Sequence, residues 1–275
     1  MSKVYHAREA LILNQVTYRY PGITQTGVDL VSMELKKGEF VGVLGANGSG
    51  KSTLARLCSA LLLPQSGEVV VGGLTSSNKE NIDRIRQIVG LVFQDAECQF
   101  VANTVASEIA FGLENHGLPT GIIRERVRKI MEFFQLTPLA KTAPGFLSGG
   151  EKKKLALASV LVMRPEILLV DEPLTMLDQT NREEVSSYLW DLRRDGTALL
   201  WFSHSLDELL KADRVLILYA GKMVWQGRPE KILSMVEQAQ KWGISLPIVS
   251  ELTAELGLGA LGIGKEEELV ARLWK

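Results

Sequence analysis

Nine consecutive residues have the composition and spacing of a phosphate-binding loop, the P-loop pattern G-x-x-x-x-G-K-[ST]. They are Gly45, Ala46, Asn47, Gly48, Ser49, Gly50, Lys51, Ser52 and Thr53. The glycines let successive backbone N–H groups turn inward around a phosphate chain, and a helix beginning at Lys51 adds the positive end of its dipole. In this motif the lysine reaches the β- and γ-phosphates, and the Ser52 hydroxyl ligates Mg²⁺. The sequence therefore predicts a nucleoside triphosphate site.

The residues on either side of the loop support this interpretation. Residues 40–44 are apolar and short enough for a buried strand, and residues 53–63 are apolar and predict a helix. The motif requires this strand–loop–helix context. The alternative is a Gly-rich turn with an idle lysine, and residues further along the chain argue against it.

Two carboxylates follow another apolar strand, residues 167–170. Asp171 is expected at the strand tip, where it can hold Mg²⁺ through a water molecule. Glu172 points in another direction and can polarise an attacking water. Such pairs are often caps or surface acids, and taken alone the two interpretations are equally favoured. A P-loop in the same sheet favours catalysis.

Residues Leu147 to Glu151 open the last helix of a long helical stretch. Ser148 and Glu151 have the spacing of a capping box, with Ser148 as the N-cap. Capping does not explain Gly149 and Gly150 between them, because glycine is a poor helix former. The two glycines indicate that a phosphate approaches the backbone closely.

Composition sets limits on the class of protein. The 275 residues suffice for one large or two modest domains, and 31 basic against 32 acidic residues give no overall field that would favour nucleic acid. Cys58 and Cys98 fit a reducing compartment, and Cys58, in the apolar helix, is expected to pack rather than to react. The N-terminus lacks a cleavable signal pattern, and no apolar run is long enough to span a membrane.

The order of elements predicts an α/β fold with a mostly parallel sheet covered on both faces. Strands are expected at 10–20, 28–35, 40–44, 67–73, 88–93, 167–171, 197–202 and 214–219. Helices are expected at 53–63, 104–115, 121–135, 148–162, 180–194 and 206–211, and the block from about 95 to 164 forms an inserted helical subdomain. Short amphipathic helices at 231–242, 247–256 and 265–274 form a C-terminal appendage.

This motif set, in this order, resembles an ABC-type ATPase subunit over residues 11 to 229. The resemblance implies a P-loop NTPase fold: a RecA-like core with a mostly parallel sheet, an antiparallel β region and the inserted helical subdomain. It divides the chain into an ATPase domain, 1–227, and a C-terminal dimerisation extension, 228–275. The core of the ATPase domain is 1–94 and 165–227. ATP and Mg²⁺ are the implied ligands.

Residue by residue, the resemblance implies five further roles. Tyr20 stacks on adenine, and Gln94 contacts Mg²⁺ and the attacking water and senses a membrane partner. Glu172 is the general base, and His204 contacts the γ-phosphate. Asp178 ends the loop that follows Glu172. His204 also follows a buried strand, although a lone histidine there is more often structural.

Two stretches depart from the family pattern. Ser148, Gly149, Gly150 and Glu151 match the signature motif that binds the partner's ATP, but the motif usually ends in glutamine. The pair Thr175-Met176 replaces the usual small residues before Leu177-Asp178. These departures suit one half of an asymmetric pair, so the sequence favours a heterodimer with a related ATPase over a homodimer.

The resemblance narrows after Gln94. The segment that contains Asp95, Glu97, Cys98, Gln99 and Phe100, together with residues 108–115 and the C-terminal extension, is similar to the ATPases of energy-coupling factor (ECF) transporters. Those transporters import vitamins and transition-metal ions. By this resemblance the segment forms a groove for arginine-bearing coupling helices of a transmembrane subunit. Without the resemblance, a solvated turn is the preferred interpretation.

The leading hypothesis is therefore an ATP-hydrolysing subunit peripheral to the cytoplasmic face of the membrane. Two such subunits sandwich two ATP molecules, and their closure and reopening drive a transmembrane coupling protein. A separate membrane protein captures the substrate, and no nucleic acid takes part. A soluble ABC ATPase of cofactor assembly or nucleic-acid maintenance is the alternative. The single P-loop, the lack of a heptad run and the two cysteines disfavour it. A regulator without turnover is disfavoured because Glu172 and His204 are both present.

Overall fold

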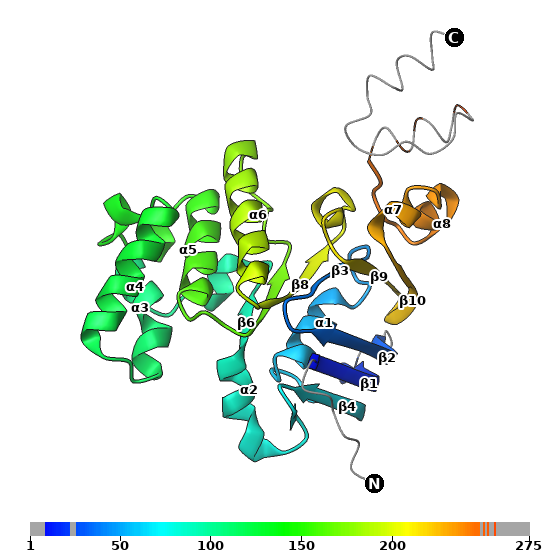
Figure 1. Ribbon diagram of the computed structural model, residues 1–275, viewed down its shortest axis with the longest axis horizontal. Coiled ribbons are helices and arrows are strands. Elements are labelled where there is room, and N and C mark those ends of the chain that lie inside the picture. The colour runs from blue at the N-terminus through cyan, green and yellow to red at the C-terminus, as the bar shows by residue number, and fades with distance from the viewer. Residues whose placement is uncertain (1–8, 23–25, 248–249, 251, 253–255, 257–275) are drawn as a thin grey trace.

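A six-stranded sheet forms the centre of the molecule in the computed structural model, which describes residues 9–22, 26–247, 250, 252 and 256 (Figure 1). Its order is β10-β9-β3-β8-β7-β6, with β10 antiparallel to β9 and the other neighbours parallel. The strands are β3 (Phe40–Leu44), β6 (Val89–Val92), β7 (Ile167–Asp171), β8 (Ala198–Ser203), β9 (Arg214–Tyr219) and β10 (Lys222–Gly227). The order brings β3, which precedes the P-loop, between two strands from the last third of the chain.

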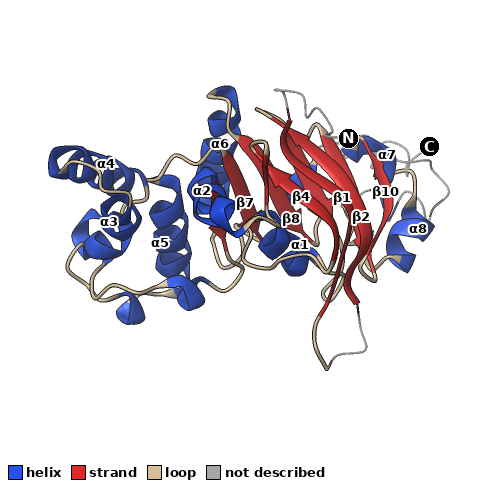
Figure 2. Cartoon of the chain, turned by 90° about the horizontal axis from the view of Figure 1, so that it is seen from below, coloured by secondary structure: helices blue, strands red, loops and turns tan. Residues whose placement is uncertain are grey.

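A second, antiparallel sheet has the order β2-β1-β4-β5 (Figure 2). Its strands are β1 (Glu9–Arg19), β2 (Thr26–Lys36), β4 (Ser66–Val71) and β5 (Leu74–Thr75). Helix α1 (Lys51–Cys58) packs against β2 and β4 of this sheet and against β7 of the larger one. The P-loop helix is therefore held between the two sheets.

Both faces of the large sheet are buried at β3, and the side chains of this strand alternate between them. Val41 and Val43 of β3 belong to the core that faces α1 and the antiparallel sheet. Phe40 and Leu44 belong to the core on the opposite face, which the helices cover. This alternation follows from the period of two in a strand, and burial on both faces explains why β3 is a continuous apolar run.

Helices α3 (Val105–Asn115), α4 (Thr120–Phe133) and α5 (Gly149–Leu161) lie beyond β6 as a group in both views (Figures 1 and 2). They follow one another between β6 and β7, where the sequence predicts helical structure. Helix α3 packs on both α4 and α5, and α5 contacts β6 and the short 3₁₀ helix η2 (Ala96–Gln99). Helix α6 (Gln179–Arg194) links β7 to β8. The predicted α/β class, with a mostly parallel sheet and an antiparallel β region, is confirmed.

Several predicted elements are wrong in extent or kind. The predicted helix 206–211 is only a 3₁₀ turn, η5 (Asp207–Leu209), and Leu209 packs against Gly42 of the sheet. The helix predicted to reach residue 63 ends at Cys58, and Ala60 has a φ of 53°, which breaks the helix. Helix α2 (Ile82–Ile88) and strand β10 were not predicted. Strand β10 exposes every second residue, a weak signal at a sheet edge.

The C-terminal part differs in the same way. The helix predicted over 231–242 is two short helices, α7 (Pro229–Ile232) and α8 (Val236–Lys241). Met235 lies between them with a φ of −113° and a ψ of 42°, which is not helical. The helices predicted at 247–256 and 265–274 lie largely or wholly outside the described residues.

Candidate functional site

Four neighbouring strands end at one edge of the large sheet, and each end carries a predicted site residue. The parallel strands β3, β8, β7 and β6 lead into the P-loop, His204, Asp171–Glu172 and Gln94 respectively. Backbone hydrogen bonds continue past the strands, from Gly45 N to Ser203 O at 3.1 Å and from Glu172 N to Phe202 O at 3.0 Å. In open α/β sheets, ligands bind outside the carboxyl ends of the strands.

The P-loop needs glycine at three positions. Gly48 and Gly50 have φ angles of 77° and 108°, in the left-handed region that side chains disfavour. A Cβ at Gly50 would collide with the carbonyl oxygen of Gly27, and one at Gly45 would lie 2.5 Å from the carbonyl oxygen of Leu218. The loop is therefore closed tightly over the sheet, with its backbone free of side chains where a phosphate chain would lie.

Lys51 is folded back over the loop that precedes it. Its Nζ donates to the carbonyl oxygens of Gly45 at 2.7 Å and Ala46 at 3.1 Å, and the residue is only 6% exposed. Burial lowers the pKa of the ammonium, while the nearby carboxylates of Glu172 and Asp171 act in the opposite direction. The lysine thus holds a positive charge against the loop, where it can neutralise phosphate oxygens.

Ser52, in the first turn of α1, and Asp171, at the end of β7, meet where a metal ion is expected. Ser52 Oγ donates to Asp171 Oδ2 at 2.7 Å, although the residues are 119 positions apart. Asp171 Oδ1 is buried and has no hydrogen-bond partner among the described residues, and burial raises the pKa of this carboxyl. A hard cation satisfies such a buried oxygen, so the hydroxyl and carboxylate fit Mg²⁺.

Glu172 lies between two predicted site residues. Its Oε2 accepts from Gln94 Nε2 at 3.0 Å, and its Oε1 lies 3.0 Å from His204 Nδ1. The glutamate is 5% exposed, whereas the side chain of His204 is 53% exposed. Glu172 also has a φ of 47°, and strained backbone of this kind clusters at functional sites. A hydrogen-bonded, mostly buried carboxylate beside the P-loop is suited to accept a proton from water.

The predicted capping box at the start of α5 is confirmed. Ser148 Oγ accepts from Glu151 N at 3.4 Å, and Glu151 Oε2 accepts from Ser148 N at 2.8 Å. The backbone N–H and the hydroxyl of Ser148 both donate to the Glu151 carboxylate and lower its pKa, so the side chain is held as an anion. Met176 packs beside the two glycines, since a Cβ at Gly149 would lie 3.2 Å from the Met176 sulfur. Helix α5 lies well to one side of α1 in both views (Figures 1 and 2).

Two other predicted residues have local partners. The Tyr20 hydroxyl accepts from Arg56 Nη1 at 3.1 Å, which holds the ring against α1 next to the P-loop. Asp178 is the N-cap of α6 and accepts from Asn181 N at 2.9 Å. Capping accounts for the position of Asp178, and a role towards nucleotide would be additional to it.

The segment after Gln94 has both exposed and inward-facing side chains. Asp95, Glu97 and Cys98 are exposed: Asp95 caps η2, and Glu97 pairs with Lys152 Nζ at 2.6 Å. Cys98 Sγ donates to Asp95 Oδ2 at 3.3 Å, and the aspartate raises the pKa of the thiol. Gln99 faces inward and donates to Ala156 O at 3.1 Å.

Phe100, at the end of this segment, is half-buried and packs against the helical core. The exposed surface of the segment is therefore carried mainly by Asp95, Glu97 and Cys98.

Sequence reasoning missed two polar side chains that support the site. Lys153 is 3% exposed, and its Nζ reaches the carbonyl oxygens of Phe93 and Gln94. Burial lowers its pKa to about 8. Glu208 accepts from Ser203 Oγ at 2.9 Å and so braces the turn before His204. A hint for Lys153 is its place on the same helical face as Ala156 and Leu157, which are buried.

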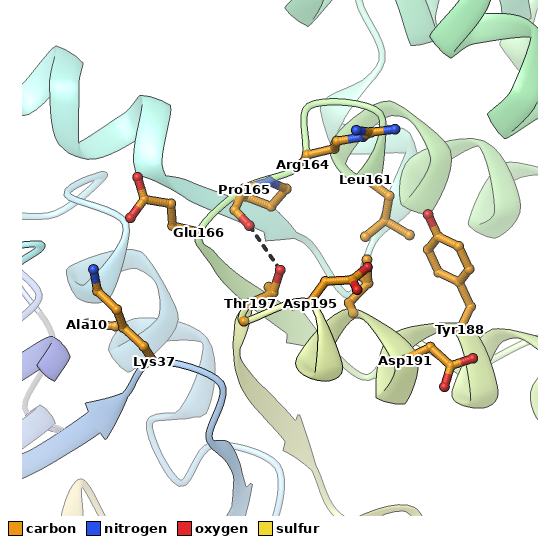
Figure 3. A pocket seen from close by; sticks show the side chains of 12 residues that line it. Ala10, Lys37, Leu161, Arg164, Pro165, Glu166, Tyr188, Asp191, Asp195 and Thr197 are labelled. Atoms are coloured by element: carbon orange, nitrogen blue, oxygen red, sulfur yellow. Dashed lines mark hydrogen bonds between the residues drawn. The ribbon is translucent and has the colours of Figure 1, made fainter. Parts of the chain in front are cut away.

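The cavity in Figure 3, of about 700 Å³, lies elsewhere. Glu166 and Thr197, which precede β7 and β8, line it together with Lys37, Arg164 and Tyr188. Thr197 Oγ1 donates to Pro165 O at 3.4 Å across its wall. These are the amino ends of the strands, opposite to the edge that carries the P-loop, so the cavity is separate from the candidate site.

A family model described as ABC transporter matches residues 28–175, more than half of the chain. The chain therefore belongs to the ABC transporter family, and it is an ABC ATPase, with a P-loop cassette that hydrolyses ATP in support of transport. Among the described residues, no helix combines the length and apolar character needed to cross a bilayer.

Within that family, the chain is similar to ATP-binding proteins of energy-coupling factor transporters. It is 40% identical over 243 residues to EcfA1 of Clostridium perfringens, covering 88% of this chain and 86% of that protein. It is 37% identical over 268 residues to EcfA1 of Listeria monocytogenes, covering 96% of each. A solved structure of cbiO1 from Clostridium perfringens, described as part of the ABC transporter complex cbiONQ, matches with a TM-score of 0.73 and 30% identity, covering 90% of this chain and 99% of that one.

Proposed function

We propose that this chain is one of two ATPase subunits in an energy-coupling factor importer, and that closing and reopening of the pair drives uptake of a vitamin or transition-metal ion. The chemistry at each site is attack of water on the γ-phosphate of ATP. Glu172 accepts a proton from the water, Lys51 neutralises phosphate charge, and His204 and Gln94 orient the reacting groups.

One observation carries the proposal. Gln94, Asp171–Glu172, His204 and the P-loop meet at one sheet edge, while α5, whose N-cap is Ser148, lies to the side. The signature residues Ser148, Gly149 and Gly150 are then available to a second subunit's nucleotide, and a partner's signature motif would complete the site of this chain. A matching solved structure, MJ0796 bound to ADP and Pi, is described as dimeric (25% identity, TM-score 0.74, covering 80% of this chain and 98% of that one).

Mg²⁺ is the metal that we assign to this site. Ser52 and Asp171 would hold it, with Gln94 close by through its contact with Glu172. When bound, the ion neutralises charge on the β- and γ-phosphates. Tyr20 supplies the adenine contact, Asp178 lies next to the partner's site, and Glu151 supplies the charge that distinguishes this signature motif.

A heterodimer with a related ATPase is favoured over a homodimer. The Glu151 carboxylate is held as an anion beside two glycines proposed to face a γ-phosphate, and Met176 covers one side of them. In a homodimer this signature motif would weaken ATP binding at both sites. A partner with the usual glutamine would keep one site with full affinity for ATP.

The membrane partners follow from the same resemblance. Asp95, Glu97 and Cys98 present the exposed surface after Gln94, with Phe100 beside them, and would receive coupling helices of a transmembrane protein on the cytoplasmic face. Forked guanidinium–carboxylate pairs would fix the orientation of those helices. A separate membrane protein would bind the substrate. In this proposal residues 1–227 are the ATPase domain, with about 95–164 as the helical subdomain, and 228–275 serve dimerisation.

The experiment is recovery of the intact complex from membranes through a tag on this chain, followed by native mass spectrometry. We expect this chain, a second ATPase chain and membrane proteins in one assembly. A complex with two copies of this chain would contradict the heterodimer, and recovery without any membrane protein would contradict the importer. A tagged Gly50→Val variant, which blocks the P-loop, is the control for nucleotide-dependent association.

A further inference from the structure

Hydrogen bonds from two side chains, Lys153 of α5 and Gln99 of η2, connect α5 to the chain that follows β6. Lys153 Nζ donates to Phe93 O at 3.3 Å and to Gln94 O at 3.2 Å. Gln99 Oε1 accepts from Phe93 N at 3.4 Å, while its Nε2 donates to Ala156 O of α5 at 3.1 Å. Both backbone polar groups of Phe93 are thus bound by side chains that belong to α5 or contact it.

Lys153 stands out because it is buried with a charge. The residue is 3% exposed, and its ammonium donates to two carbonyl oxygens rather than to a carboxylate. Removing an ammonium from water is unfavourable, so a buried lysine needs compensating partners. The backbone after β6 provides them: the carbonyls of Phe93 and Gln94 accept from α5, on the side where the described residues place no further strand beside β6.

The contact continues from the backbone of Gln94 to the catalytic base. The side chain of Gln94 donates to Glu172 at 3.0 Å, and Glu172 is also within 3.0 Å of His204. A short path therefore runs from α5 through Lys153 and Gln94 to Glu172. Helix α5 begins at Gly149, after its N-cap Ser148, in the motif proposed to face the nucleotide of the other subunit.

We propose that Lys153 is a positioning residue that fixes the backbone of Gln94 to α5, so that the glutamine of one ATP site moves with the signature motif of the other. This rests on the proposed dimer. A shift of α5 when its signature motif engages a partner's nucleotide is passed to Gln94 and sets its distance from Glu172. Without Lys153, each site would still bind ATP but would no longer respond to the other.

The test uses the reconstituted complex with Lys153→Met, Lys153→Gln and Lys153→Arg. Misplacing a catalytic contact by about 1 Å can lower a rate by about 100-fold, so we expect Lys153→Met to lower kcat by about 10- to 100-fold. KM for ATP should stay within about twofold, and the Hill coefficient for ATP hydrolysis should fall towards one. Lys153→Arg, which keeps N–H donors and charge, should restore at least half of the lost rate. Lys153→Gln keeps a hydrogen-bond donor but removes the charge, so it separates the two contributions. It replaces Lys153→Met in the test if the methionine variant does not fold.

Lys129→Met is the matched control, because Lys129 is a lysine of the helical region whose ammonium pairs on the surface with Glu125. It should leave kcat and cooperativity unchanged. The inference would be overturned if Lys153→Met and Lys153→Gln both kept the wild-type kcat and Hill coefficient. It would also be overturned if ATP affinity and melting temperature fell together with kcat and Lys153→Arg did not restore them. A wild-type complex that does not hydrolyse ATP would instead contradict the proposed function.

Discussion

Gln94 donates from its amide to the Glu172 carboxylate across 3.0 Å, although 78 positions separate the two residues in the chain. They follow the ends of the neighbouring parallel strands β6 and β7, and His204 approaches the other carboxylate oxygen from the end of β8. The proposed base is thus oriented by two groups on different strands. Its position depends on the strand order of the whole sheet.

Glu172→Gln should abolish ATP turnover and leave ATP binding intact. Glutamine keeps the size of the side chain but cannot accept a proton, and general-base assistance is worth about 10²- to 10⁴-fold in rate. Steady-state hydrolysis and retention of nucleotide by the reconstituted complex measure the two effects. Glu39→Gln, at a carboxylate that pairs with Arg214 away from the site, is the control. Near-normal ATP turnover by Glu172→Gln would contradict the assignment of Glu172 as the general base.

Asp171→Asn should change the stability of the chain and its affinity for Mg²⁺ in different directions: stability is kept or raised, and Mg²⁺ binding is lost. Burial raises the pKa of Asp171, so above that pKa the ionised carboxylate weakens folding, and removing its charge should keep or raise the melting temperature of the nucleotide-free chain. Asparagine still accepts from Ser52 but is a poor ligand for Mg²⁺, so the additional stabilisation by Mg²⁺ with ATP should disappear. Differential scanning calorimetry with and without Mg²⁺–ATP measures both.

Asp213→Asn provides the contrast. Asp213 accepts from Phe40 N at 2.9 Å and pairs with Arg193 at 2.8 Å, so it has the partners that Asp171 Oδ1 lacks. This variant should melt at a lower temperature and keep its response to Mg²⁺–ATP. A large fall in melting temperature for Asp171→Asn, with Mg²⁺ dependence retained, is the result that contradicts the metal assignment.

Glu151→Gln should strengthen ATP-driven association with the partner subunit. Glutamine preserves the capping box, since either residue can reach back to Ser148 N, but it removes the negative charge beside Gly149 and Gly150. A charge at a helix terminus is worth about two- to fivefold in an equilibrium constant. Analytical ultracentrifugation of the pair in the presence of non-hydrolysable ATP analogue gives the dissociation constant. A dissociation constant that is unchanged or larger would mean that the Glu151 carboxylate does not face nucleotide.

The double change Asp95→Asn and Glu97→Gln should weaken assembly with the transmembrane partner or uncouple transport, while ATP affinity of the isolated subunit stays the same. The changes remove the two exposed carboxylates that would pair with arginines. Asparagine can still cap η2, so the local turn is kept. Co-purification yield and substrate uptake are the measurements, and unchanged values for both would put the coupling surface elsewhere.

Cys98 offers an independent footprint of the same surface. It is exposed, whereas Cys58 is fully buried, and burial raises the pKa of the Cys58 thiol. A thiol reagent should therefore modify Cys98 alone in the native subunit, and docking of the membrane partner should protect it. Cys98→Ser identifies the signal, and modification at the same rate in free and assembled subunit would contradict docking there.

The sequence could predict which residues end the strands, because parallel strands carry their carboxyl ends to a common edge. It could not predict that Gln94 meets Glu172, since that contact requires β6 to lie beside β7. Lys153 was hidden for another reason. It is the middle of three successive lysines, which together suggest a solvated face and outweigh its helical spacing to Ala156 and Leu157. The packing of α5 on the end of β6 shows that Lys153 turns inward.

Helices and strands could be predicted from the sequence where neighbouring residues alone determine the structure. The apolar run of β3 and the spacing of Ser148 and Glu151 are strong because burial and capping act on neighbouring residues. The region 206–211 was misleading, since Leu206, Leu209 and Leu210 repeat at a helical spacing although the chain makes only a turn there. Its apolar residues are explained by the sheet beneath them, where Leu209 lies against Gly42.

The position of β3 in the sheet has a consequence for synthesis of the chain. The neighbours of β3 come much later in the chain: β8 begins at Ala198 and β9 at Arg214. A growing polypeptide therefore leaves the backbone edges of the apolar strand β3 unpaired until Tyr219 has left the ribosome. Unpaired strand edges invite pairing with other chains. Interrupted translation before residue 198 would therefore release a fragment that contains an intact P-loop sequence but aggregates instead of binding ATP.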